Sequence, residues 1–111
     1  MAWLRRRRTA GGSSDPAGRP TNEQVKAAMA HLKDFVATRV GVEMYVEPRT
    51  TVTPTTIVLI ATTGEWTRRR VADERAAAGL AKELGVPVYD VQLTGYPARM
   101  REWNARKGAT S

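Results

Sequence analysis

The clearest pattern in the chain is a helical one that begins at Thr21. Thr21 and Gln24 match a capping box, in which each side chain bonds the backbone N–H of the other residue. Gly41 is a typical residue at a helix C-terminus. The apolar residues between these signals fall on one stripe of a helical wheel: Val25, Ala28, Met29, Leu32, Phe35, Val36 and Val40. The spacing therefore predicts a helix over 21–41.

A period of two follows, which is typical of strands. Residues 42–47 alternate strictly, with Val42, Met44 and Val46 on one face. Residues 55–61 are almost continuously apolar and β-branched, which predicts a central strand covered on both faces. After turn residues at 62–65, residues 66–71 return as the partner strand.

The last third of the chain mixes the two patterns. Asp73 is placed to cap a helix that ends at Leu84, with Gly85 as its C-terminal signal. Residues 86–93 read as a fourth strand, and Tyr96-Pro97 opens a final helix. The order α-β-β-β-α-β-α predicts one α+β domain over 21–108, with helices on a mainly antiparallel four-stranded sheet and a disordered tail at 109–111. The segment from the third to the fourth strand is expected to be a right-handed parallel crossover.

Charge is distributed unevenly along the 111 residues, which carry a net charge of +7. Residues 1–20 hold five arginines and one aspartate, whereas the other 91 residues hold thirteen bases and ten acids, or +3. We therefore expect a disordered basic arm and linker over 1–20, followed by a mildly basic domain. Part of the arginine excess is also what GC-rich codon usage produces.

Absences in the composition narrow the classes of function. The chain has no cysteine and one histidine, His31, which argues against disulfides, thiolate chemistry and Cys/His zinc sites. Residues 9–20 are too polar to follow Arg5–Arg8 as a secretory signal, and no apolar run is long enough to span a bilayer. These features favour a cytoplasmic location for the protein. No cofactor motif is present, so we expect no cofactor.

Four short sequence motifs together carry a family resemblance: Val46-Glu47-Pro48, GEWTRRRV at 64–71, VPVYD at 86–90 and GYPARMREWN at 95–104. They resemble a group of small actinobacterial proteins that also open with a short arginine-rich stretch. The resemblance covers about 25–106, and no activity established for that group can be carried over to these residues.

Catalytic chemistry finds little support in the sequence. The element order resembles that of restriction-endonuclease-like nucleases, but the strand at 55–61 lacks an acid and Thr67 stands where a lysine is needed after Glu65. His31 falls beside the apolar stripe of the helix predicted over 21–41, where a histidine at the border between the buried and exposed faces is the simpler interpretation. Glu43 and Glu47 share a strand face, from which they could pair with Arg68 or Arg70. Asp90 lies within an apolar strand and, if buried, needs a partner such as Arg69 or Arg70.

Arginine and tryptophan recur together on one predicted strand and on the last predicted helix. We call this set the Arg/Trp surface; it consists of Trp66, Arg68, Arg70, Arg99, Arg101, Trp103 and Arg106. If strand and helix lie side by side, these residues form a surface that can hold a partner. The competing interpretation is a solvated edge strand whose arginines prevent aggregation, with Trp66 and Trp103 in the core.

The leading hypothesis is a non-enzymatic binding or adaptor protein that engages a protein partner through the Arg/Trp surface. The alternative is a nucleic-acid-binding module that contacts phosphates through Arg5, Arg6, Arg7 and Arg8 of the arm together with the strand at Arg68–Arg70. Met1–Arg8 also suits weak peripheral contact with an anionic membrane.

Overall fold

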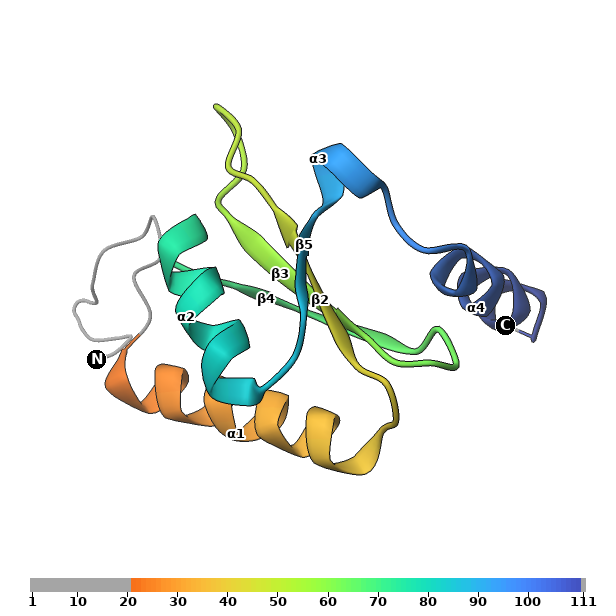
Figure 1. Ribbon diagram of the computed structural model, residues 1–111, viewed down its shortest axis with the longest axis horizontal. Coiled ribbons are helices and arrows are strands. Elements are labelled where there is room, and N and C mark those ends of the chain that lie inside the picture. Colours follow the sequence, from red (N-terminus) through yellow and green to blue (C-terminus); the bar gives the residue numbers. More distant parts are fainter. Residues whose placement is uncertain (1–20, 111) are drawn as a thin grey trace. The chain divides into compact units, whose positions relative to one another are not determined.

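A computed structural model describes residues 21–110, with the side chains of residues 21–107. The elements occur in the following order: α1 (Asn22–Thr38), β2 (Glu43–Glu47), β3 (Thr56–Ile60), β4 (Trp66–Arg70), α2 (Glu74–Leu84), β5 (Val88–Asp90), α3 (Val91–Thr94) and α4 (Ala98–Thr110) (Figure 1). This order confirms the predicted α+β class. Helix α4 includes two of the three residues expected in a tail, and the arm expected over 1–20, with Arg5–Arg8, lies outside the described residues.

The four strands form one mixed sheet in the order β4-β3-β2-β5. Strand β3 pairs antiparallel with both β2 and β4, whereas β2 and β5 are parallel. It follows that β4 and β5 run in the same direction at opposite edges of the sheet. The segment between them, which contains α2, is thus a crossover between parallel strands, as the sequence predicts.

Helix α1 begins as predicted and ends earlier than predicted. Gln24 Oε1 accepts from the Thr21 backbone N–H at 2.8 Å, and Thr21 Oγ1 accepts from that of Gln24 at 3.1 Å, which confirms the capping box. The helix ends at Thr38 instead of near Gly41. Val40 is 79% exposed, because the chain has already left the helix there and turns into β2 through Gly41 at φ +66°.

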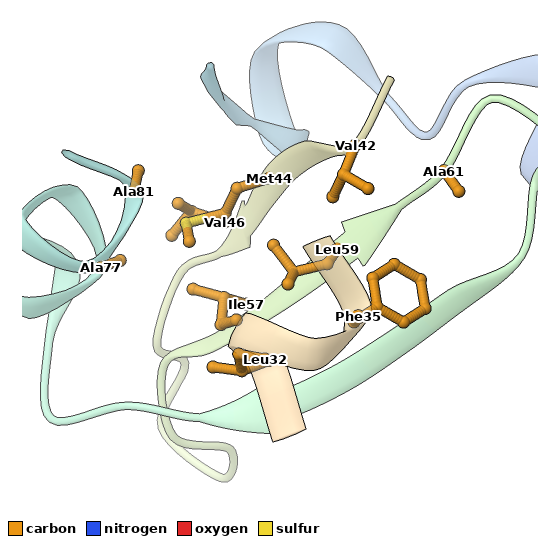
Figure 2. Close-up of a cluster of buried hydrophobic side chains, with 10 residues drawn as sticks. All are labelled: Leu32, Phe35, Val42, Met44, Val46, Ile57, Leu59, Ala61, Ala77 and Ala81. Atoms are coloured by element: carbon orange, nitrogen blue, oxygen red, sulfur yellow. The ribbon is translucent and has the colours of Figure 1, made fainter. Parts of the chain in front are cut away.

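One face of the sheet carries the larger core (Figure 2). Its members come from the C-terminal part of α1, from the sheet and from α2: Leu32, Phe35, Val42, Met44, Val46, Ile57, Leu59, Ala61, Ala77 and Ala81. The alternation predicted over 42–47 is confirmed, since Val42, Met44 and Val46 all lie in this cluster. The small side chains Ala77 and Ala81 are the buried residues of α2, and they permit close approach of that helix to the strands.

The opposite face holds a smaller core that fixes the C-terminal segment. Tyr45, Val58, Ile60 and Met100 are buried there, and Trp66 and Tyr96 pack against them. Met100 belongs to α4, which in Figure 1 lies beside the turn of the β3–β4 hairpin. Ile57 to Ile60 of β3 are all fully buried, so the prediction of a central strand covered on both faces is confirmed.

The fourth strand is shorter than the sequence predicts. Residues 86–93 were expected to be a strand, but β5 covers only Val88–Asp90 and the short helix α3 follows at once. The Asp90 side chain accepts from the Gln92 backbone N–H at 2.8 Å and caps α3. Asp90 is therefore a capping residue at a strand end, and the predicted partnership with Arg69 or Arg70 is replaced by this cap. In α2 the predicted signals are confirmed, because Asp73 caps the N-terminus and Gly85 ends the helix in the left-handed region.

Candidate functional site

The β3–β4 turn brings α4 beside β4. Gly64 lies in this turn with φ +95°, and a Cβ there would collide with the Arg99 carbonyl and lie 2.9 Å from the Trp103 Cβ. The chain can approach α4 this closely only because residue 64 has no side chain. Trp66 Nε1 donates to Asn104 Oδ1 at 2.7 Å, and Arg106 Nη2 donates to the Thr63 carbonyl at 3.2 Å. The condition set from the sequence, that this strand and this helix lie side by side, is met.

Glu47 is the centre of one polar cluster on this face. Arg68 binds its carboxylate with two nitrogens, Nε to Oε1 at 2.8 Å and Nη2 to Oε2 at 2.9 Å. Thr56 and Tyr96 also donate their hydroxyls to the same carboxylate. The sheet register explains the meeting, because Glu47 lies opposite Thr56 and Arg68 lies opposite the next residue on the same face of β3, Val58. One of the pairings expected from the sequence is thus present.

Glu43 is the centre of a second cluster at the other end of β2. Arg99 Nη2 lies 2.6 Å from Glu43 Oε1, and Tyr45 donates its hydroxyl to the same oxygen at 3.0 Å. Arg99 Nε also donates to the Ala61 carbonyl at 2.9 Å, so this side chain joins α4 to both β2 and the end of β3. Each cluster therefore contains one glutamate, one arginine and one tyrosine.

The electrostatics of the two clusters differ in their main cause. The hydrogen bond from Arg99 lowers the pKa of Glu43 and outweighs the opposing effect of burial. At Glu47, burial is the largest single effect and raises the pKa, but the hydrogen bonds from Arg68, Thr56 and Tyr96 together leave the pKa below its usual value. Burial and the neighbouring glutamates raise the pKa of both Tyr45 and Tyr96. Both glutamates are therefore ionised and both tyrosines are neutral near pH 7.

Cations lie over both tryptophan rings of the Arg/Trp surface. The Arg68 guanidinium lies 5.1 Å from the Trp66 ring centroid, and Arg106 and Lys107 lie 5.8 and 4.6 Å from that of Trp103. Both rings are half-buried. The sequence left two interpretations open, tryptophans exposed on a binding surface or tryptophans in the core. Neither describes the rings fully, since each ring has one part packed against the protein and another part at the surface.

The arginines of the Arg/Trp surface fall into two groups. Arg68 and Arg99 are held by glutamates in the clusters described above. Arg70, Arg101 and Arg106 are exposed, and two of them make hydrogen bonds to backbone carbonyls, Arg101 to Tyr96 at 2.8 Å and Arg106 to Thr63 at 3.2 Å. Arg68 is both paired with Glu47 and exposed at its side chain, so this pairing does not seal it inside the protein.

Sequence reasoning missed a further ion pair at the turn of the β3–β4 hairpin. Arg39 binds Glu65 with Nε and Nη2, at 3.2 and 2.7 Å. The hydrogen bond from Arg39 lowers the pKa of Glu65. No local signal predicts this pair, because the two residues are far apart in sequence and meet only through the tertiary fold.

The remaining candidates from the sequence lie apart from this surface. His31 is exposed on α1, and Asp90 caps α3. Among residues 21–110, no group of three or more His, Asp or Glu side chains is placed to hold a metal ion. Within the same residues, none of the helices has the length and apolar composition that crossing a bilayer requires. Comparison with models of known protein families, with curated proteins and with solved structures found no match to this chain.

Proposed function

We propose that this protein is a small non-enzymatic binding protein that engages a protein partner through the Arg/Trp surface. The observation that carries the proposal is the pair of half-buried tryptophans on adjacent elements, each with a cation over its ring. Tryptophan and arginine are the residue types most enriched among residues that dominate protein–protein binding energy. A ring fixed at one edge by a hydrogen bond, as Trp66 is by Asn104, loses little conformational entropy when a partner covers it.

The charge arrangement favours a protein over a phosphate backbone. Arg68 and Arg99, two of the arginines that would have to grip phosphates, are already paired with Glu47 and Glu43. A phosphate that displaced either glutamate would leave a partly buried carboxylate without its partner, which is costly. The same pairs argue against acid–base catalysis by these glutamates, because a strongly held carboxylate with a lowered pKa is a poor proton acceptor near pH 7.

The test uses arginines whose loss leaves both glutamate clusters intact. In the full tagged chain we would combine Arg101→Glu with Arg106→Glu, since these exposed side chains bond only to backbone carbonyls among the hydrogen bonds described. The matched control combines Arg49→Glu with Arg75→Glu, which makes the same charge change at exposed arginines outside the Arg/Trp surface. We expect a protein captured by the parent to be retained by the control and lost by the Arg101/Arg106 variant.

Capture is repeated at two salt concentrations, with and without nuclease. The proposal requires recovery that survives nuclease treatment. Recovered nucleic acid, with affinity that falls steeply as salt rises, would instead support the alternative in which Arg5–Arg8 and the strand at Arg68–Arg70 contact phosphates. Equal recovery by both double variants would remove the Arg/Trp surface from the explanation.

A further inference from the structure

The edge of the sheet formed by β5 lies opposite the β4 edge and has a different chemistry. Residues 84–98 contain one charged residue, Asp90, in a chain in which 26% of residues are charged. The Asp90 carboxylate is engaged as the cap of α3. Three of the large apolar side chains exposed in the described residues belong to this stretch: Val88 at 43%, Tyr89 at 37% and Leu93 at 85%. Exposed apolar side chains in an uncharged segment are typical of an interaction surface.

The backbone of β5 also presents hydrogen-bonding groups at this edge. Met44 N–H donates to the Pro87 carbonyl at 2.9 Å, so that carbonyl points toward β2. Across a trans peptide the next N–H points the opposite way. The Val88 N–H therefore points away from β2, and in an extended strand the Val88 carbonyl points the same way. Since β5 is the last strand in the sheet order, these groups are placed to pair with an added strand.

The two edges of the sheet are protected to different degrees. Strand β4 carries Arg68, Arg69 and Arg70 in succession, and consecutive charges of one sign disfavour pairing with another copy. Strand β5 has the sequence Val-Tyr-Asp and carries no lysine or arginine. On the face of the sheet that holds the smaller core, Tyr89 stacks on Tyr45 with 5.2 Å between ring centroids. This stacked pair places an aromatic side chain at the open edge.

We propose that β5 joins a second copy of this chain by antiparallel pairing of β5 with β5. In a pairing centred on Val88, the outward N–H of each Val88 would donate to the outward C=O of Val88 in the other copy, as a two-fold axis requires. It would also place the uncharged edges together and keep the arginine edges, β4 of each copy, far apart. A second copy fits this edge because the outward N–H and C=O of Val88 complement each other about a two-fold axis, and because β5, unlike β4, carries no lysine or arginine that would oppose its own copy.

The short length of β5 predicts a weak dimer. Three residues a side bury less than a standard stable interface of about 1,600 Å², so we expect a Kd of about 10–100 μM. Since the two copies repel each other through their net charge, salt should strengthen the dimer. This dependence is opposite in sign to that of a phosphate-binding protein.

Sedimentation velocity on the full chain, at several concentrations and at two salt concentrations, tests the proposal. Val88→Lys places two lysines opposite each other at the proposed axis and should weaken the dimer at least about tenfold. The matched control is Val52→Lys, which makes the same change at a valine that is 87% exposed in the β2–β3 connection, and it should leave dimerisation unchanged.

A measurement on the parent covers the case in which Val88→Lys fails to fold. Hydrogen exchange of the Val88 amide should slow as protein concentration rises, because dimerisation covers that N–H. A parent that stays monomeric up to about 1 mM, ten times the upper end of the expected range, would overturn the proposal. A dimer that Val88→Lys leaves intact would do the same. A monomeric parent whose Val88→Lys variant alone loses a captured protein would assign the β5 edge to another protein's strand instead.

Discussion

The packing of α4 against the β3–β4 turn depends on Gly64, and Gly79 in α2 serves as the matched control for the same substitution. Gly64 is buried in the turn at φ +95°, where any Cβ meets the Arg99 carbonyl and the Trp103 Cβ. Gly79 is exposed within α2, and a Cβ there would meet nothing within 4 Å. The same substitution, glycine to alanine, should therefore change stability in opposite directions at the two positions.

The magnitudes follow from the two environments. At Gly64, a positive φ costs alanine about 1–2 kcal/mol. The collision adds to this, because its nearest atom is a backbone carbonyl that cannot rotate away. We expect Gly64→Ala to lower the free energy of unfolding by about 3 kcal/mol and the Tm by about 12–24 °C. At Gly79, alanine is the better helix former by about 0.5–1 kcal/mol, which should raise the Tm by about 2–8 °C.

Thermal unfolding followed by circular dichroism measures both changes. Tryptophan emission in a Trp3→Phe background reports on Trp66 and Trp103 alone, since the chain has three tryptophans. If α4 moves to accommodate the new methyl group, emission should shift in Gly64→Ala and not in Gly79→Ala. A Gly64→Ala protein as stable as the parent would show that α4 does not depend on close contact with the turn, and would refute the geometry on which the Arg/Trp surface rests.

Substitutions at three further positions test a polar cluster, a helix cap and the buried core. Glu47→Gln should cost about 1–2 kcal/mol at pH 7, since Arg68 is partly exposed and solvent screens the pair. The folded-state pKa of Glu47 is lowered, so its contribution is present above the ordinary value of about 4.3 and is lost as pH falls through the folded pKa; urea unfolding should find the difference from the parent shrinking between pH 7 and pH 3. Asp73→Ala should cost about 1 kcal/mol in urea unfolding, because it removes the acceptor for the Ala76 N–H, whereas Asp73→Asn should cost little. Leu59→Ala should cost about 2–5 kcal/mol in the same assay, because Leu59 is fully buried; a loss below 1 kcal/mol would contradict a packed core there.

Local signals in the sequence were sufficient for most of the fold. The capping pairs at Thr21 and Asp73, the alternation over 42–47 and the apolar run over 55–61 each specify an element without reference to the rest of the chain. They failed where one residue type has two local uses. Asp90 can end a strand as a capping residue or lie within one, and the apolar residues around it suit both; the bond to the Gln92 N–H decides between these in the structure.

The candidate site was predicted less completely, because its contacts join distant parts of the chain. A pairing of Glu47 with Arg68 or Arg70 could be expected from strand alternation, but only the register selects Arg68. The Arg99–Glu43 and Arg39–Glu65 pairs join residues 56 and 26 positions apart, and neither has a signal in the sequence. Composition likewise could not show which arginines are paired and which face solvent.

This division among the arginines leads to a test of whether the two proposed surfaces are independent. Arg68 and Arg99 hold the sheet and α4 together through glutamates, so replacing them tests folding, whereas replacing Arg101 and Arg106 tests binding. Val88 lies on the edge strand β5, and the strands β2 and β3 separate it from Trp66 and Arg68 on β4. Effects at such separated sites should add without coupling. We therefore expect the Arg101/Arg106 double variant to dimerise as the parent does, and Val88→Lys to capture the same protein partner as the parent. If each variant lost both properties, the two surfaces would be one interface, in which dimerisation creates the surface that the partner binds.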